Sequence, residues 1–193
     1  FSGFFNDAAA QEHIALRNLA GAPQATFFQS TTLGDAACGI LGRQGNYDWT
    51  REANGALRFV AVIESDGFPA MEWGKSLTAG KRTDTGATNG TGVDFTTVST
   101  AFGLVAYLQV FAFTGTSVTV AIQESSDNGV GDPFAAVTGG AFAAVSAANV
   151  VERIQTGLTV TVERYLRAVT TGTFTNAQFA VLVKRYISAN AEV

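Results

Sequence analysis

The sequence predicts a mainly β protein: an antiparallel β-sandwich or barrel with one flanking α-helix, an N-terminal arm and a long loop. From residue 102 onward, short apolar runs alternate with glycine-containing turns, which is typical of antiparallel sheets. Only residues 7–20 carry the start and stop signals of a helix. The 193 residues suit an arm and helix, 1–45, followed by one β domain, 46–193, which includes the long loop 75–98.

The N-terminal arm is rich in aromatic residues. Phe1, Phe4 and Phe5 lie within the first five positions. Side chains of this size gain from burial, so they are expected to pack on their own domain or to insert into a neighbouring subunit. An assembly protein favours the second arrangement.

The predicted helix, 7–20, follows the arm. Asn6 or Asp7 can cap its first turn, an alanine triplet favours helix, and Gly21 can end it. Its apolar stripe is only partial.

The first clear sheet signal is a hairpin. The strand-like runs Tyr47–Arg51 and Leu57–Ser65 flank Asn54-Gly55, a dipeptide that favours tight hairpin turns. The second run alternates imperfectly, as a strand buried on both faces would.

The predicted long loop, 75–98, is polar and rich in Gly and Thr, with no hydrophobic period. Loops of this length in compact domains are usually functional or disordered. In an assembly, we expect this one to be ordered against a neighbouring subunit.

The C-terminal part carries the strongest strand pattern. Two predicted strands, 103–115 and 117–125, meet near Gly115, and further short apolar runs follow to residue 186. The second strand alternates apolar with polar or small residues. The apolar ones, which should share one face, are Val118, Val120 and Ile122.

The charge composition limits the partners. Twelve basic and 16 acidic residues give a net charge of −4, and no basic run is longer than two residues, as in Lys81-Arg82. Binding to nucleic acid needs a basic patch, so direct DNA binding is not expected, whereas a mildly acidic surface lets DNA slide past. Charged residues make up only 15%, against ~25% in ordinary domains. This indicates either a surface covered by other subunits or a β protein that is simply polar rather than charged.

Cysteine content and hydropathy give further expectations. Cys38 is the only cysteine, so the fold rests on packing without an internal disulfide. No apolar run reaches the length of a membrane span. The first residues lack the charged and apolar regions of a signal peptide, which favours a cytosolic origin.

The stretch "GFPAMEWGKS", residues 67–76, partly matches a phosphate-binding loop. The full motif needs a glycine at position 69, where Pro69 stands, and proline has no N–H to offer a phosphate. The polar run after Lys75 is no helix, so no helix N-terminus would hold the anion. The sequence therefore argues against nucleotide binding.

No catalytic set, metal site or cofactor site is predicted, and the protein is not expected to be an enzyme. His13 is interpreted as a packing or surface residue, and Cys38 as a buried structural thiol. One His and one Cys do not make a zinc cluster. Asp127 and Asp132 offer oxygen ligands for Ca²⁺, but without EF-hand spacing, so a turn is the simpler interpretation.

Four aromatic residues are candidates for a carbohydrate-binding face, although core packing is favoured because each has apolar neighbours. They are Trp49, Trp73, Tyr107 and Tyr165.

Three segments between residues 102 and 186 form a recognisable series: "FGLVAYLQVFAFTGTSVTVAIQESSDNG", "FAAVTGGAF" and "VERYLRAVTTGTFTNAQFAVLVKRY". The series resembles a module of virion proteins of tailed phages. The upstream "MEWGKSLTAGKRTDTGATNGTGVD" resembles the linking segment of those classed as major tail proteins. The resemblance covers residues 50–186 and is more specific for the module than for the virion part that it builds.

The resemblance implies a structural role. Tail-tube subunits stack as hexameric rings around a DNA channel, with a β-sandwich or barrel core, a flanking helix, and arms or loops that reach adjacent rings. A homo-oligomer in the virion is therefore expected, made in the host cytoplasm, in contact with other virion proteins and without specific DNA binding. The expected interface residues are Phe1, Phe4, Phe5, Lys75, Lys81, Arg82, Thr83 and Asp84.

Two alternatives stay open. The same module also suits a capsid decoration protein or another head protein. A β-sandwich with exposed aromatic residues also suits a carbohydrate-binding module of a tail tip or fibre.

Overall fold

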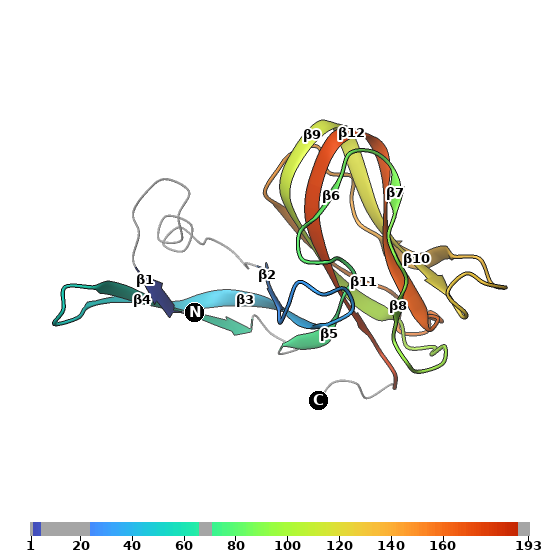
Figure 1. Ribbon diagram of the computed structural model, residues 1–193. Coiled ribbons are helices and arrows are strands. Elements are labelled where there is room, and N and C mark those ends of the chain that lie inside the picture. The colour runs from blue at the N-terminus through green and yellow to red at the C-terminus, as the bar shows by residue number, and fades with distance from the viewer. Residues whose placement is uncertain (1, 5–23, 66–70, 189–193) are drawn as a thin grey trace. The chain divides into compact units, whose positions relative to one another are not determined.

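The computed structural model describes residues 2–4, 24–65 and 71–188, which form antiparallel β-strands and, within these ranges, no helix (Figure 1). The predicted mainly β fold is therefore confirmed, while the helix expected at 7–20 lies outside the described residues. The strands are β1 Ser2–Phe4, β2 Gln24–Phe28, β3 Ala36–Arg51, β4 Leu57–Ser65, β5 Glu72–Ser76, β6 Arg82–Asp84, β7 Thr88–Asn89, β8 Val93–Asp94, β9 Leu104–Ser125, β10 Ala135–Ala141, β11 Val150–Gln155 and β12 Tyr165–Arg185.

The chain divides into two compact units. Unit 1 comprises residues 1–25 and 40–71, and unit 2 comprises 26–39 and 72–193. Strand β3 contributes residues to both, and the domain boundary expected between residues 45 and 46 lies within this strand.

Unit 1 is built on the predicted hairpin. Strands β3 and β4 pair from Gly42↔Ser65 to Arg51↔Leu57, and the turn is closed by a bond from the Gly55 N–H to the Glu52 carbonyl, at 2.9 Å. Strand β1 pairs with β4 along the edge away from β3 (Figure 1). The hairpin and its Asn-Gly turn are thus confirmed.

The centre of unit 2 is a ribbon of two long strands. Strand β9 has 22 residues and β12 has 21, and they pair from Leu104↔Arg185 to Ser125↔Tyr165 (Figure 1). The sequence predicts two strands that meet at Gly115, but the structure has one continuous strand that bends there. The reason is close backbone approach: a Cβ on Gly115 would lie 2.4 Å from the Cα of Phe174. Gly172, with φ 118°, allows the same close backbone approach in β12, where a Cβ would lie 2.4 Å from the Ser117 carbonyl oxygen.

Shorter strands flank this ribbon. The outer edge of β9 pairs with β11 along its first half and with β10 along its second. The outer edge of β12 pairs in turn with β5, β6, β7 and β8. The predicted long loop, 75–98, therefore differs from a free loop, because three of its short segments are strands held against β12.

One face of the whole ribbon lines the main core. Away from the bend, the even-numbered apolar residues of β9 belong to a single buried cluster: Leu104, Ala106, Leu108, Val110, Val118, Val120 and Ile122. The shared inward face predicted for part of this strand is confirmed, because Val118, Val120 and Ile122 are fully buried. On the opposite face of the ribbon's first half, a smaller cluster forms around Tyr107 and Leu182, with Ala37 from β3.

The two tryptophans depart from the expected core packing. Trp49 is 64% exposed and Trp73 is 54% exposed. Along β5 the inward positions are taken by Glu72 and Ser76, so the alternation of the strand turns Trp73 outward. Buried positions are confirmed for Cys38 and Tyr107.

Candidate functional site

A buried ion pair crosses one half of the unit 2 sheet. Glu72 on β5 is 1% exposed and receives two hydrogen bonds from Arg153 on β11. The Arg153 Nε donates to Glu72 Oε2 at 2.8 Å, and Nη2 donates to Oε1 at 2.9 Å. Since β12 and β9 lie between these two strands, the pair ties four neighbouring strands together.

Two tyrosines complete this network. Tyr107 donates its hydroxyl hydrogen to Glu72 Oε2, and Tyr186 donates to Oε1 at 3.4 Å. Burial, followed by the bond to Glu72, raises the pKa of Tyr107 above its usual value. The hydrogen bonds that Arg153 donates to Glu72 raise the pKa of Arg153. Both carboxylate oxygens are occupied by donors from the chain, so this arrangement acts as a structural clamp rather than as a general base.

Gly39 makes room for the clamp. A Cβ at this position would lie 2.5 Å from Cε2 of the Tyr107 ring. Only glycine allows β3 to pass this close to the tyrosine that donates to Glu72.

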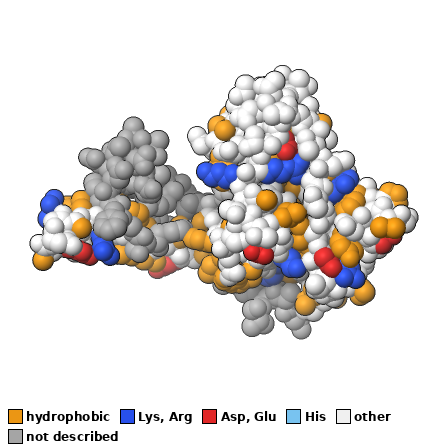
Figure 2. Space-filling model, viewed as in Figure 1, with side chains coloured by type: hydrophobic (Ala, Val, Ile, Leu, Met, Phe, Trp, Pro, Cys, Tyr) orange, Lys and Arg blue, Asp and Glu red, His pale blue; other side chains and the backbone are white. Residues whose placement is uncertain are grey.

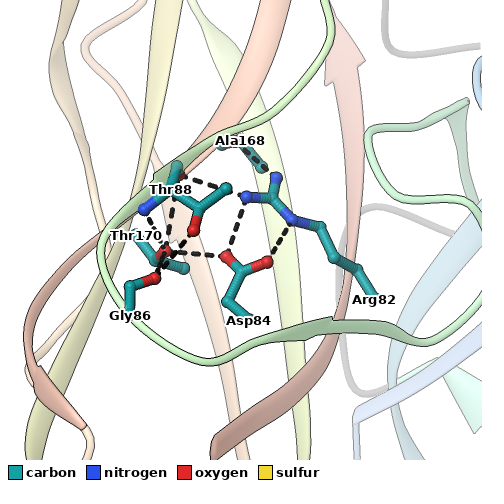
Figure 3. A network of polar contacts seen from close by, with 6 residues as sticks. All are labelled: Arg82, Asp84, Gly86, Thr88, Ala168 and Thr170. Carbon is teal, nitrogen blue, oxygen red and sulfur yellow. Dashed lines mark hydrogen bonds and ion pairs between the residues drawn. The ribbon is translucent and has the colours of Figure 1, made fainter. Parts of the chain in front are cut away.

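A second polar network pins the predicted loop onto β12, as Figure 3 shows. Arg82 donates to both carboxylate oxygens of Asp84, at 2.8 and 2.7 Å, and to the Ala168 carbonyl at 2.8 Å. Thr170 on β12 donates to Asp84 at 2.7 Å, and its oxygen accepts the Thr88 N–H at 3.1 Å. The loop is thus fastened from both sides of the ion pair, which is largely shielded from solvent.

A shallow depression of about 270 Å³ lies beside this network. Arg82 lines it together with Leu77 and Asn89. Because the Arg82 guanidinium is already held by Asp84 and by main-chain carbonyls, the depression has no free cation from this residue to offer an anion.

The lysine of the partial phosphate-loop motif has a structural role. Lys75 lies on β5 and donates from Nζ to the Asp94 carbonyl at 2.8 Å, with its ammonium 5.6 Å from the centre of the Phe95 ring. The strand runs on to Leu77, which is buried in the main core. Lys75 therefore fastens the two ends of the loop segment to each other.

The structure separates the predicted interface residues. Lys75, Arg82 and Asp84 are held by contacts within the chain, whereas Lys81 and Thr83 are exposed. Phe1 and Phe5 lie outside the described residues. For Phe4 the structure gives the backbone pairing with Arg58 on β4.

The carboxylates proposed for calcium cap their own turn. Asp127 accepts N–H bonds from Val130, Gly131 and Asp132, at 2.6 to 3.2 Å. Asp132 accepts from the N–H and the hydroxyl of Ser126, both at 2.8 Å. These bonds lower the pKa of both carboxyl groups. Within the described ranges, no cluster of three or more His, Cys, Asp or Glu side chains suits a metal ion.

The raised pKa values of two glutamates near this turn predict how the stability of the protein depends on pH. Burial raises the pKa of Glu124 and of Glu163 above 4.5, and the hydrogen bond between Glu163 and Asp132 adds to the second shift. A carboxyl group whose pKa rises on folding stabilises the protein while it is protonated, and this contribution is lost as the pH rises through the raised pKa. The melting temperature should therefore fall as the pH rises from mildly acidic to neutral. In more acidic solution the trend should reverse, because protonation of Asp127 and Asp132 there lowers the melting temperature.

The variant Glu124→Gln tests this expectation. Glutamine keeps the acceptor for the Glu163 N–H, at 2.9 Å in the parent, but does not titrate. It should melt higher than the parent at neutral pH and should approach the parent at mildly acidic pH. Glu64→Gln, on the hairpin, controls for the loss of one negative charge. An equal gain at all pH values would contradict the assigned role of Glu124.

Apolar side chains lie open on the hairpin of unit 1. Trp49 is 64% exposed, Val60 is 47% exposed and Val62 is 41% exposed; we call these three the hairpin surface. Two-stranded hairpins are marginal in water on their own. Isolated apolar side chains are ordinary on a protein surface, but three of them on one thin ribbon make it a candidate contact surface.

Charged side chains do not gather into one basic patch on the face drawn in Figure 2, where blue and red side chains occur in small separate groups. Most of the described surface on this face carries neither charged nor hydrophobic side chains. This distribution agrees with the charged fraction of 15%, and this face carries no extended basic patch of the kind that binds nucleic acid.

A second candidate contact is the edge of β11. This strand pairs with β9 along one side, and among the described strands none pairs with its other side. Val151 on this strand is 46% exposed. An unpaired edge offers main-chain donors and acceptors to an added strand.

The clamp of Glu72 and Arg153 was missed by the sequence interpretation. Its signal is present in the sequence, since each residue is a charge inside an apolar strand, in "MEWG" and "VVERIQ". Charges in such strands need partners when they are buried. The sequence does not show which charges pair, because strands far apart in the chain bring them together.

Hydropathy and comparison with known proteins also bear on the function. In the described ranges, no helix has the length and hydropathy needed to cross a membrane. No protein-family model matches the chain, and no curated protein matches it.

Proposed function

We propose that the protein is a structural virion protein of a tailed phage, which self-assembles into stacked rings that form the tail tube. Its subunits would contact one another and other virion proteins, and DNA would pass through without specific binding. The resemblance of residues 102–186 to a virion-protein module of tailed phages, and of the upstream linking segment, 71–94, to major tail proteins, supports this proposal. The net charge of −4 is compatible with a channel to which DNA does not adhere.

The observation that carries the proposal is the exposed hairpin surface. Trp49 lies opposite Phe59 in the strand register, while Val60 and Val62 alternate onto the other face of the hairpin. Exposed apolar side chains on both faces of one ribbon fit an arm that enters a neighbouring subunit, where Trp49 on one face and Val60 and Val62 on the other would be covered.

The finer description of unit 2 belongs to this proposal. A β-sandwich is supported by the bend of the β9–β12 ribbon, which places residues from both halves in one core. Two halves of one bent sheet that share a core in this way would correspond to the two layers of the subunit body that the resemblance implies.

The two outer edges of unit 2 also support ring formation. The edge of β12 is covered by the short strands β5 to β8, while the described part of the chain leaves one edge of β11 unpaired. Pairing at such an edge with another copy would extend the sheet across subunits, and closed rings remove exposed edges.

The test replaces Val60 and Val62 with lysine in one variant. Both side chains point to the same face of β4, and two charges there should oppose its burial. We expect association at least about tenfold weaker, equivalent to ~1.4 kcal/mol, without a large fall in the melting temperature of the subunit. Sedimentation velocity and negative-stain micrographs measure the association.

The matched control is Val130→Lys. Val130 is 89% exposed in the turn after β9, so the same charge there should leave assembly unchanged. A parent protein that stays monomeric at high concentration would refute the proposal. Trimers in place of sixfold rings would favour a capsid decoration or head protein.

A carbohydrate-binding module remains a second candidate because Trp49 and Trp73 are exposed at 64% and 54%. Exposed indole rings can stack on sugar faces. Binding on a glycan array that is lost in Trp49→Ala or Trp73→Ala would support this function. A silent array would count against it.

A further inference from the structure

The chain contains three Asn-Gly pairs, at Asn54, Asn89 and Asn128. In this dipeptide the glycine nitrogen can attack the side-chain carbonyl carbon of the asparagine, because glycine has no side chain to obstruct the approach. The attack needs a free glycine N–H and a mobile backbone. The glycine N–H is hydrogen-bonded at all three sites, so the sites differ in what must move to free it.

Asn89 is held in a strand. It pairs with Val169 in the ladder between β7 and β12, and the Gly90 N–H donates to the Ala168 carbonyl at 2.9 Å. Arg82 donates to the same carbonyl. Freeing the Gly90 nitrogen therefore requires β7 to leave the central ribbon.

Asn128 is held by its side chain as well as its backbone. The Gly129 N–H donates to the hydroxyl of the buried Ser125 at 2.8 Å. The Asn128 Oδ1 lies so close to Gly92 that a Cβ there would be 2.1 Å away. The carboxamide cannot rotate toward Gly129 without disturbing this contact.

Asn54 is held by local bonds in the turn of unit 1. The Gly55 N–H donates to the Glu52 carbonyl at 2.9 Å, and the Ala56 N–H donates to Asn54 Oδ1 at 2.9 Å. The second bond holds the side-chain oxygen of Asn54 within the same short turn as the Gly55 peptide. A Cβ on Gly55 would meet nothing within 4 Å, so the turn has room to move.

The cost of opening ranks the three sites. Opening the turn at Asn54 breaks contacts within a hairpin, whereas opening the other two disturbs the ribbon or its packed turns. Segments with few buried contacts open at lower free energy than core strands. The exposed hairpin turn should therefore reach the reactive geometry most often.

We propose that Asn54 is a site of spontaneous deamidation in the folded protein. The Gly55 nitrogen gives up its proton and bonds to the Asn54 side-chain carbon, and the bond from that carbon to Nδ2 breaks with release of ammonia. Water then opens the resulting succinimide at either carbonyl, giving aspartate or isoaspartate. The product adds a negative charge beside the Arg58–Glu52 ion pair, at 2.9 Å in the parent, and isoaspartate also lengthens the main chain of the turn.

This inference does not rest on the proposed function. The test incubates the whole protein at mildly alkaline pH and follows all three sites by peptide mapping with mass spectrometry. We expect Asn54 to convert at least about tenfold faster than Asn89 or Asn128 in the folded state. In urea, where no fold protects them, the three sites should convert at similar rates.

The variant Asn54→Gln serves as the control, because glutamine reacts far more slowly by this route. It should remove the fast conversion and leave the rates at Asn89 and Asn128 unchanged. The proposal is overturned if Asn54 is no faster than the other two sites in the folded protein. It is also overturned if the same ratio of rates persists in urea, because the fold would then not be the cause.

Discussion

Replacing Glu72 with glutamine is expected to lower the free energy of unfolding by about 3–5 kcal/mol, because it leaves the Arg153 guanidinium buried without its counter-charge. Arg153 is bound at both guanidinium positions that face Glu72, and its side chain is 16% exposed. Tyr107 and Tyr186 would also lose a charged acceptor. Urea unfolding monitored by fluorescence would measure the loss as a shift of the midpoint at constant slope.

A matched control is Glu52→Gln, which breaks the pair with Arg58 on the hairpin. This pair has the same kind of contact, at 2.9 Å, but its side chains are 37% and 54% exposed. Its loss should cost less than about 1 kcal/mol. The double variant Glu72→Gln with Arg153→Met should recover part of the stability, since it removes the stranded charge. A loss in Glu72→Gln as small as in Glu52→Gln would show that water reaches the clamp.

Replacing Gly74 with alanine is expected to destabilise the protein by about 3 kcal/mol or more, or to abolish soluble folded protein. A Cβ on Gly74 would lie 2.0 Å from the carbonyl oxygen of Val183 and 2.8 Å from the Cα of Lys184. These are backbone atoms of β12, so relief requires β5 to move away from the strand with which it pairs. Circular dichroism and thermal melting of the purified variant would measure the effect.

Gly86→Ala provides the control for this change. A Cβ on Gly86 would meet nothing within 4 Å, so the same substitution there should alter stability by no more than about 0.5 kcal/mol. If Gly74→Ala were tolerated as well as Gly86→Ala, the close packing of β5 against β12 would be refuted.

Local sequence patterns correctly predicted those features of the fold that depend on neighbouring residues in the chain. The hairpin at Asn54-Gly55 and the inward face of Val118, Val120 and Ile122 follow from dipeptide preference and from alternation, and both are confirmed. The continuity of β9 through Gly115 could not be predicted in this way. Glycine is a turn signal in the sequence, but here it allows a bent strand to pass close to the backbone of its partner.

The same distinction applies to the predicted loop 75–98. Its Gly- and Thr-rich composition predicts a loop, yet β6, β7 and β8 in this segment pair with β12. The ion pair of Arg82 and Asp84, with Thr170, fastens β6 and β7, and Arg164 binds Asp94 on β8. Partners so distant in the sequence leave no periodic signal nearby. The outward position of Trp73 has a similar cause, because Glu72 takes the inward side to meet Arg153.

The long ribbon also determines the order in which the protein can fold. Strand β9 ends at Ser125 and β12 begins only at Tyr165, so during synthesis the apolar β9 leaves the ribosome well before its main partner. Pairing between segments so distant along the chain raises the contact order and slows folding. Until the last strand is made, β9 is exposed to pairing with other nascent chains. Pairing of β12 with β9 is therefore expected to be the committing step of folding, and chaperones that shield β9 during this interval would raise the yield of native protein.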